Sequence, residues 1–286
     1  MKKSIHIKKE IRVVGLRRTG NHAIINWIVN QQKGKKLFIN DTPTLASPYR
    51  NNYQPPDDGY LDTLIYSHED RRLNYVGNPY FEKRHDTFVG KSKKRFDVLI
   101  LRDPFNLFAS RYHSDRTRVY ANSLSVPDMW IMYAREYLGI TNFLKHNKVL
   151  INYNKWCTDF LYRKKLAEQL ELEFTDEGFE KVSIVGKGSS FDGIEYNNKA
   201  SKMKVLERWK SFQNDENYIK YFQDKIIIDL SDKIFERPKD IDEFINKKII
   251  PNYAFWAFLR RKFIDLSVYP AELAIHVRIR LGLTTN

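Results

Sequence analysis

Two glycines near the start of the chain have the spacing of a phosphate-binding loop. Gly15 and Gly20 are separated by four residues, as in the P-loop pattern G-x-x-x-x-G-K-[ST]. An apolar run typical of a buried strand precedes them, and a helix-like apolar run follows them. Backbone N–H groups of such a loop, together with the helix N-terminus, can bind a phosphate group. The segment therefore predicts an anion-binding cradle.

The loop lacks the two residues with which nucleoside triphosphatases hold Mg-ATP. Asn21 and His22 occupy the positions of the Lys that contacts the β- and γ-phosphates and of the Ser or Thr that binds Mg²⁺. Arg17 and Arg18 supply positive charge from inside the loop instead. We therefore expect an anion site that does not take Mg-ATP.

A second pattern predicts another anion site. Arg102 follows the apolar run 98–101, and Asp103 and Pro104 come next. Because Asp is a favoured N-cap and Pro is favoured in the first helical turn, a helix should begin there, with Ser110 about two turns into it. Ligands of parallel α/β sheets bind beyond the carboxyl ends of the strands. Arg102 and the glycine loop should therefore share one edge, which suits a ligand with two separated phosphate groups.

The remaining elements alternate between strand and helix patterns. Continuous Val, Ile and Leu runs favour strands that are buried on both faces. We expect strands at residues 11–16, 36–40, 61–67, 97–101, 148–153 and 225–230, and helices at 21–32, 106–112, 127–145, 156–170 and 201–212. Residues 42–59 read as a long loop and 83–95 as a polar surface connection. This alternation predicts an α/β fold, a three-layer sandwich with a central parallel sheet, over residues 1–250.

Composition limits the partners and the location. The chain has 286 residues and a net charge of +14, which favours an anionic partner. The single Cys157 excludes an internal disulfide framework, and we find no signal peptide and no run of about 18 apolar residues, so we expect a cytoplasmic protein. The tail 251–286 combines aromatic and basic residues. It either packs on the domain as helices or lies at an anionic membrane surface at the inner face of the membrane.

The two anion motifs together resemble those of the sulfotransferases that use 3′-phosphoadenosine 5′-phosphosulfate (PAPS). The family's phosphosulfate loop resembles residues 17–22, and its 3′-phosphate motif resembles Arg102 to Ser110. Residues 149–153 resemble the late strand whose Tyr approaches the adenine. Residues 186–190 resemble, more loosely, the basic glycine loop over the cofactor, and residues 206–209 the helix after it. The resemblance spans roughly residues 11–235.

The resemblance implies a set of site residues and a P-loop-like fold. Those implied to bind the cofactor are Arg17, Arg18, Thr19, Gly20, Asn21, His22, Arg102, Ser110, Tyr153, Lys187 and Gly188. Many cytosolic members carry Lys-Ser-Gly-Thr-Thr where this chain has residues 18–22. Arg18 can stabilise charge on the bridging oxygen, but it donates a proton less readily than Lys because it stays protonated.

Transfer of a sulfuryl group to a hydroxyl also needs a base for the acceptor proton. The family commonly places a histidine at the end of a comparable strand, and His68 holds that position here. Imidazole has a pKa near 6.5 in water, which suits this role. Glu69 is the alternative, since some glycan-directed members resemble it with an acidic base, and His113 after the second motif is a further candidate. No cluster with metal-ligand spacing is present, so we expect no metal.

The leading hypothesis is a PAPS-dependent sulfotransferase that acts on a hydroxyl of an acceptor, with a glycan or glycolipid favoured. The alternative is a non-catalytic nucleotide- or polyanion-binding protein, in which the same loops bind an anion without transfer. A kinase-like phosphotransferase is disfavoured, because the loop lacks its Lys and Ser/Thr. The ordered pair of anion motifs is not a feature that general basicity requires, so we expect no specific nucleic-acid partner.

Overall fold

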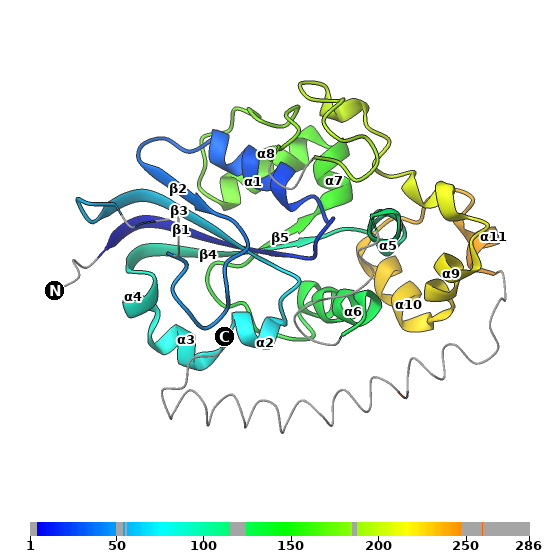
Figure 1. The fold of residues 1–286 in the computed structure, drawn as a ribbon, viewed down its shortest axis with the longest axis horizontal. Helices are drawn as coiled ribbons and strands as arrows, with labels where there is room; N and C mark the ends of the chain where they lie inside the picture. Colours follow the sequence, from blue (N-terminus) through cyan, green and yellow to red (C-terminus); the bar gives the residue numbers. More distant parts are fainter. Residues whose placement is uncertain are drawn as a thin grey trace.

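A parallel sheet forms the centre of the molecule. In the computed structural model, the described residues are 5–49, 54, 56–114, 124–184, 188–246 and 259. Within them, five parallel strands pair in the order β2-β3-β1-β4-β5 (Figure 1). The strands are β1 (His6–Gly15), β2 (Lys36–Ile39), β3 (Tyr60–Glu69), β4 (Lys91–Leu101) and β5 (Val149–Asn152).

Helices cover both faces of the sheet, so the predicted three-layer α/β sandwich is confirmed. On one face lie α1 (Asn21–Asn30), α7 (Tyr153–Thr158) and α8 (Phe160–Gln169); on the other lie α2 (Leu73–Val76), α3 (Pro79–Lys83), α4 (His85–Phe88) and α6 (Val126–Tyr137) (Figure 1). Beyond the carboxyl ends of the strands lie α5 (Pro104–His113), α9 (Glu216–Ile219), α10 (Lys225–Ile234) and α11 (Ile241–Ile245). Three short 3-10 helices complete this end: η1 (Ala200–Lys202), η2 (Arg208–Phe212) and η3 (Lys220–Gln223).

The central strands are apolar on both sides because both of their faces are buried. Val13 of β1 packs in one cluster with Ile24 of α1, while its neighbour Val14 packs in another with Trp130 of α6, and all four are fully buried. The register of β1 pairs its last residue, Gly15, with Glu69 of β3 and Ile100 of β4. The segments that follow these strands are therefore neighbours at one edge of the sheet.

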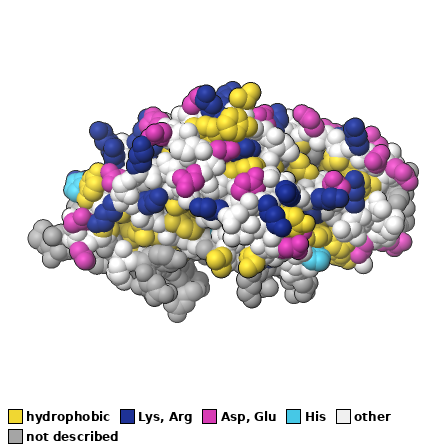
Figure 2. Space-filling view, turned by 90° about the horizontal axis from the view of Figure 1, so that it is seen from above, with side chains coloured by type: hydrophobic (Ala, Val, Ile, Leu, Met, Phe, Trp, Pro, Cys, Tyr) yellow, Lys and Arg dark blue, Asp and Glu magenta, His cyan; other side chains and the backbone are white. Residues whose placement is uncertain are grey.

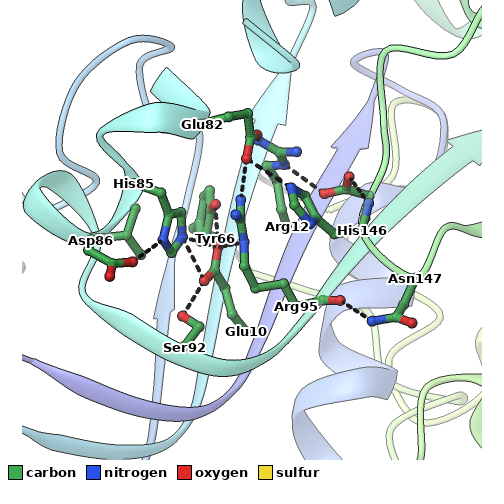
Figure 3. A network of polar contacts seen from close by, with 12 residues as sticks. Glu10, Arg12, Tyr66, Glu82, His85, Asp86, Ser92, Arg95, His146 and Asn147 are labelled. Atoms are coloured by element: carbon green, nitrogen blue, oxygen red, sulfur yellow. Dashed lines mark hydrogen bonds and ion pairs between the residues drawn. The ribbon is translucent and has the colours of Figure 1, made fainter. Parts of the chain in front are cut away.

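A buried polar network holds α3 and α4 against the other end of the sheet (Figure 3). Glu10 accepts hydrogen bonds from Tyr66 Oη at 2.8 Å and from Ser92, and lies 2.9 Å from His85 Nε2. Burial alone would raise the pKa of Glu10, but the contacts with His85, Arg95 and Ser92 outweigh it and lower the pKa to about 2. Arg12 extends the network by pairing with acidic groups on both sides. These charges are stable in the interior because they are paired.

Five of the six predicted strands are confirmed, and the sixth is wrong. Residues 225–230 belong to α10, not to a strand. Asp224 accepts a hydrogen bond from the Ile226 N–H at 3.2 Å and so caps a helix. Ile227, Leu230 and Ser231 then lie buried at helical spacing.

Several predicted helices differ in extent. The helix predicted at 127–145 ends at Tyr137, and Gly139 follows with a φ of +72°. The one predicted at 156–170 is two helices, because Asp159 starts α8 by accepting from the Tyr162 N–H at 3.0 Å. The one predicted at 201–212 is wrong: only its two ends are helical, as η1 and η2, with residues 203–207 between them non-helical.

Two further expectations concern connections and the tail. Residues 83–95, expected as a surface connection, contain α4 and the start of β4. The tail 251–286 lies outside the described residues, apart from position 259. Among the described residues, the helices are too short or too polar to cross a membrane.

Candidate functional site

The glycine loop makes a tight turn between β1 and α1. The Thr19 N–H donates to the Leu16 carbonyl at 3.1 Å, and Arg18 and Gly20 have φ values of +71° and +94°. Gly20 is the N-cap of α1 and has no side chain with which to cap the helix. The N–H groups of the first helical turn have no acceptor within a helix, so an anion at this position can accept from them.

Glycine is required at position 20 by its neighbour as well as by its backbone. A Cβ at Gly20 would lie 2.0 Å from Cε2 of Tyr153, which is far inside van der Waals contact. The ring of Tyr153, which begins α7 directly after β5, is therefore packed directly on the loop. This contact brings the end of β5 to the same edge as β1.

Carboxylates surround Arg17 on the β3 side of the loop. Arg17 Nη2 lies 2.7 Å from Asp41 Oδ2, and its Nε lies 3.5 Å from Glu69 Oε2. Asp70 accepts from the Arg17 N–H at 2.9 Å and from Arg111 Nη1 at 2.7 Å. The charge of Arg17 is thus balanced within the protein, and its main effect is to fix the loop against β3.

Arg18 and Arg102 lie on the other side of the loop. Arg18 Nη1 donates to the carbonyl of Gly188 at 3.4 Å, which joins the glycine loop to the 188–193 turn. Arg102, at the end of β4, donates through Nη1 to the carbonyl of Arg18 at 3.0 Å. The two predicted anion motifs are therefore in direct contact.

The strongest electrostatic feature of the site is a pair of buried arginines that share one hydroxyl. Arg102 Nη1 and Arg208 Nη1 lie 3.2 and 3.1 Å from Oγ of Ser110, which is completely buried in α5. Arg102 is 1% exposed and Arg208 is 9% exposed. Burial, followed by the charge of Arg102, lowers the pKa of Arg208 to about 10. Two like charges held this close in the interior favour the binding of an anion between them.

Arg208 is a candidate site residue that the sequence motifs do not single out. The resemblance at residues 206–209 predicts only a helix, yet Arg208 also contacts Ser189 Oγ at 2.8 Å and Asp192 Oδ2 at 3.3 Å. In the sequence Arg208 stands between Glu207 and Trp209, with Lys210 next, so no local signal marks it out. In the fold it is 9% exposed, and a buried arginine indicates a charge with a specific partner.

The two anion motifs open into one cavity of about 400 Å³. Tyr153 and Trp156 form an aromatic wall, with ring centroids 6.0 Å apart and planes 23° apart. The guanidinium of Arg102 lies 5.1 Å from the centroid of the Tyr153 ring. Cys157 also lines the cavity, and burial raises the pKa of its thiol to about 11, so the wall is uncharged at neutral pH. Such a wall suits a flat aromatic ring.

The two candidate bases from β3 have different surroundings, because neighbouring strand residues point to opposite faces. Glu69 lines the cavity, and its side chain is 10% exposed. His68 does not line it: the side chain is buried, with Nδ1 2.9 Å from the carbonyl of Thr42. Burial lowers the pKa of His68 to about 4. The third candidate, His113, stacks on Phe191 at 4.2 Å and also lies outside the cavity lining.

The cavity gathers most of the residues predicted from the sequence. Those that line it are Arg17, Arg18, Gly20, Asn21, His22, Glu69, Arg102, Tyr153 and Gly188. Thr19 and Ser110 are fully buried behind it, and Lys187 lies outside the described residues. Within the described ranges, no group of His, Cys, Asp or Glu side chains could hold a metal ion.

Comparison with known proteins gives a likeness in fold. The sulfotransferase domain of the olefin synthase from Synechococcus PCC 7002 is similar, with a TM-score of 0.47 and 11% identity over 82% of this chain and 97% of that one. Mouse sulfotransferase SULT7A1 complexed with PAP is also similar, with a TM-score of 0.44 and 12% identity over 86% of this chain and 89% of that one. No family model and no curated protein matches the chain. The function therefore has to be argued from the site.

Proposed function

We propose that this protein is a sulfotransferase that moves a sulfuryl group from PAPS to a hydroxyl of an acceptor. The observation that carries the proposal is that two buried arginines, Arg102 and Arg208, share the hydroxyl of Ser110 and line the same cavity as the glycine loop. A nucleotide with phosphate groups at both the 5′ and the 3′ positions matches two anion sites and an aromatic wall that line one cavity.

The donor atoms at the second site fit a phosphate group. Arg102 Nε is buried and has no hydrogen-bond partner in the described part of the chain, so it offers a donor that an anion could use. Arg208 contributes a second guanidinium, and arginine forks match the geometry of phosphate oxygens. We assign Arg102, Arg208 and Ser110 to the 3′-phosphate and the wall of Tyr153 and Trp156 to the adenine.

The first site would hold the reacting end of the nucleotide. PAPS supplies an activated sulfuryl group attached to its 5′-phosphate. We assign the N–H groups of residues 20–22 to the 5′-phosphate, with His22 at the helix start and Arg18 beside the oxygen that bridges phosphorus and sulfur. Arg18 stabilises the negative charge that grows on this oxygen as the S–O bond breaks. Lys187 and Gly188 are assigned to the loop over the nucleotide.

Glu69 is the base that we propose. It takes the proton of the acceptor hydroxyl while the new O–S bond forms, and 3′-phosphoadenosine 5′-phosphate (PAP) leaves with the electrons of the broken bond. The exposure of Glu69 to the cavity supports this role. His68 remains the alternative named from the sequence, and its buried position on Thr42 favours a structural role. Arg18 stays protonated throughout, so the leaving group is stabilised by charge and not by proton donation.

We further propose a glycan or glycolipid as the acceptor and a cytoplasmic location, with a contact between the tail 251–286 and the membrane. The aromatic content of 14% and the net charge of +14 support an acceptor of this kind. On the face that carries α1, α7 and α8, basic side chains alternate with acidic ones (Figure 2). This mixed surface favours anion recognition by the buried arginines over general polyanion binding.

Binding and transfer test the proposal in two steps. Calorimetry without Mg²⁺ should give micromolar binding of PAP and much weaker binding of ATP. Arg102→Ala should abolish the binding of PAP, whereas Lys210→Ala, an exposed residue paired with Glu207, should not change it. Label transfer from ³⁵S-PAPS to a panel of glycans and glycolipids then identifies the acceptor. Equal affinity for ATP and PAP, or tight PAP binding without transfer to any acceptor, would favour the non-catalytic alternative.

A further inference from the structure

We propose that Asn21 is a positioning residue that orients the carboxylate of Glu69 toward the acceptor hydroxyl. This inference rests on the proposed function and deepens it. Asn21 stands where nucleoside triphosphatases carry the lysine of the loop. Its side chain points to β3 and has a different task there.

Two hydrogen bonds fix the side chain of Asn21. Its Nδ2 donates to the carbonyl of Leu16 at 3.1 Å and to Glu69 Oε1 at 2.9 Å. Asn21 is 4% exposed, so water competes little for these bonds. One amide group therefore ties the start of the glycine loop to one oxygen of the carboxylate. The other oxygen, Oε2, lies 3.5 Å from Arg17 Nε, and we assign it to the proton of the acceptor.

The packing around Asn21 leaves the side chain in one place. A Cβ at Gly15 would lie 2.1 Å from Asn21 Oδ1 and 2.9 Å from its Cγ. The first glycine of the loop is therefore needed to make room for this amide. A side chain held by packing and by two hydrogen bonds provides the fixed support that a catalytic group needs.

Other charged groups face Glu69 at longer distances. Arg17 Nε lies 3.5 Å from Oε2, and His22 Nε2 lies 3.9 Å from Oε1. Asp41 on the β2 side accepts from the backbone N–H of Glu69 at 3.3 Å. The contact with Asn21 is shorter than either contact with Arg17 or His22. It is also neutral, so it orients the carboxylate without adding a formal charge beside it.

The backbone and side chain of Asn21 would serve the two halves of the reaction. The backbone N–H belongs to the first turn of α1, which we assign to the 5′-phosphate, while the side chain holds the base. The donor nucleotide and the base are then fixed relative to each other by one residue. Displacement of a reacting group by about 1 Å can cost a hundredfold in rate, so this coupling has a measurable effect.

The test compares Asn21→Ala and Asn21→Asp with the wild type and with Asn26→Ala, a control on the same helix outside the cavity lining. Asn21→Asp keeps the shape of the side chain and loses the donor. We expect kcat to fall by about tenfold to a hundredfold in both Asn21 variants. In Asn21→Ala the dissociation constant of PAP should change by less than about threefold, because phosphate is held by N–H groups of the backbone.

Two readouts separate positioning from general damage to the fold. The acidic limb of the pH–rate profile should move to higher pH in Asn21→Asp, because the carboxylate of Glu69 loses a donor and gains a like charge. In ¹³C-glutamate-labelled protein, with the Glu69 signal assigned by Glu69→Gln, the titration of this carboxyl should move in the same direction. In the Glu69→Gln background, Asn21→Ala should cause little further loss of kcat, because the two residues act as one unit.

The outcomes distinguish the inference from the proposed function. If Glu69→Gln is inactive while Asn21→Asp keeps the wild-type kcat, pH profile and carboxyl titration, the positioning role is wrong and the function stands. If Asn21→Ala instead weakens PAP binding and kcat to the same extent, Asn21 is a cofactor ligand only. If Glu69→Gln keeps full turnover, the choice of base is wrong and this inference fails with it. The NMR titration does not depend on activity. Even if the wild type transfers no sulfuryl group, an identical titration of the Glu69 carboxyl in Asn21→Asp and in the wild type would show that Asn21 does not hold this carboxylate.

Discussion

Replacement of Arg208 by methionine should weaken nucleotide binding without weakening the fold. Arg208 is buried beside Arg102, and these surroundings lower its pKa to about 10. Against an ordinary guanidinium value of about 12.5, the difference means that charging Arg208 costs about 3 kcal/mol more in the protein than in water. Methionine has a similar length and no charge, so Arg208→Met removes this cost, which already includes the repulsion from Arg102.

The same substitution removes a charged donor from the proposed 3′-phosphate site. A hydrogen bond to a charged group contributes about 1.5–3 kcal/mol, which corresponds to roughly a 10- to 150-fold rise in the dissociation constant of PAP. The polar groups that contacted Arg208 keep other hydrogen bonds. Ser110 Oγ still accepts from Arg102 Nη1, and Asp192, whose side chain is 26% exposed, still accepts from Ser189 Oγ. We therefore expect a melting temperature that is unchanged or higher.

Calorimetry with PAP and thermal unfolding of the free protein measure the two effects separately. Lys210→Met is the matched control, since this residue lies on the same 3-10 helix and pairs only at the surface with Glu207. A strongly lowered melting temperature with unchanged PAP affinity would refute the reasoning. Arg208 would then stabilise the 188–193 turn and would not be part of an anion site.

Further variants test the loop, the buried network and the choice of base. Gly20→Ala should lower the free energy of unfolding by about 1–3 kcal/mol in urea titrations, because its Cβ would meet Tyr153, while Gly139→Ala, with open space around it, should cost less. Since the pKa of Glu10 is lowered to about 2 from 4.5, its charge contributes stability that is present above pH 4.5 and lost as the pH falls toward 2. Glu10→Gln should flatten this acid dependence in unfolding curves measured between pH 2 and 5, and an unchanged slope would show that Glu10 does not carry it. His68→Asn should keep most of the wild-type kcat in the transfer assay, since His68 lies outside the cavity lining; a loss as large as that of Glu69→Gln would restore His68 as the base.

The fold was predictable where the local pattern allows a single reading. A continuous apolar run such as residues 98–101 occurs in strands covered on both faces, and β4 has this environment. The run at 226–228 has the same composition but lies in α10. These residues form a helix because Asp224 caps its start and because one face of the helix is buried against α6. Three consecutive isoleucines do not decide between these readings by themselves.

The site was predictable in part for the same reason. Arg102 and Ser110 are placed by local sequence, because Asp103 caps α5 and fixes where the helix begins. Arg208 reaches Ser110 from 98 positions further along the chain, so no local pattern reveals the contact. The choice between His68 and Glu69 depends on the face of β3 that leads to the cavity. A shift of one residue in a strand reverses the face, and only the fold shows which residue lies there.

The central claim is that the cavity binds a nucleotide with separate 5′- and 3′-phosphate groups. The most direct test is calorimetric comparison of PAP with adenosine 5′-monophosphate, which lacks the 3′-phosphate, in the wild type and in Arg102→Ala. We predict that PAP binds at least about a hundredfold more tightly than the monophosphate to the wild type, and that this difference disappears in Arg102→Ala. Equal affinities for the two nucleotides in the wild type would contradict the account.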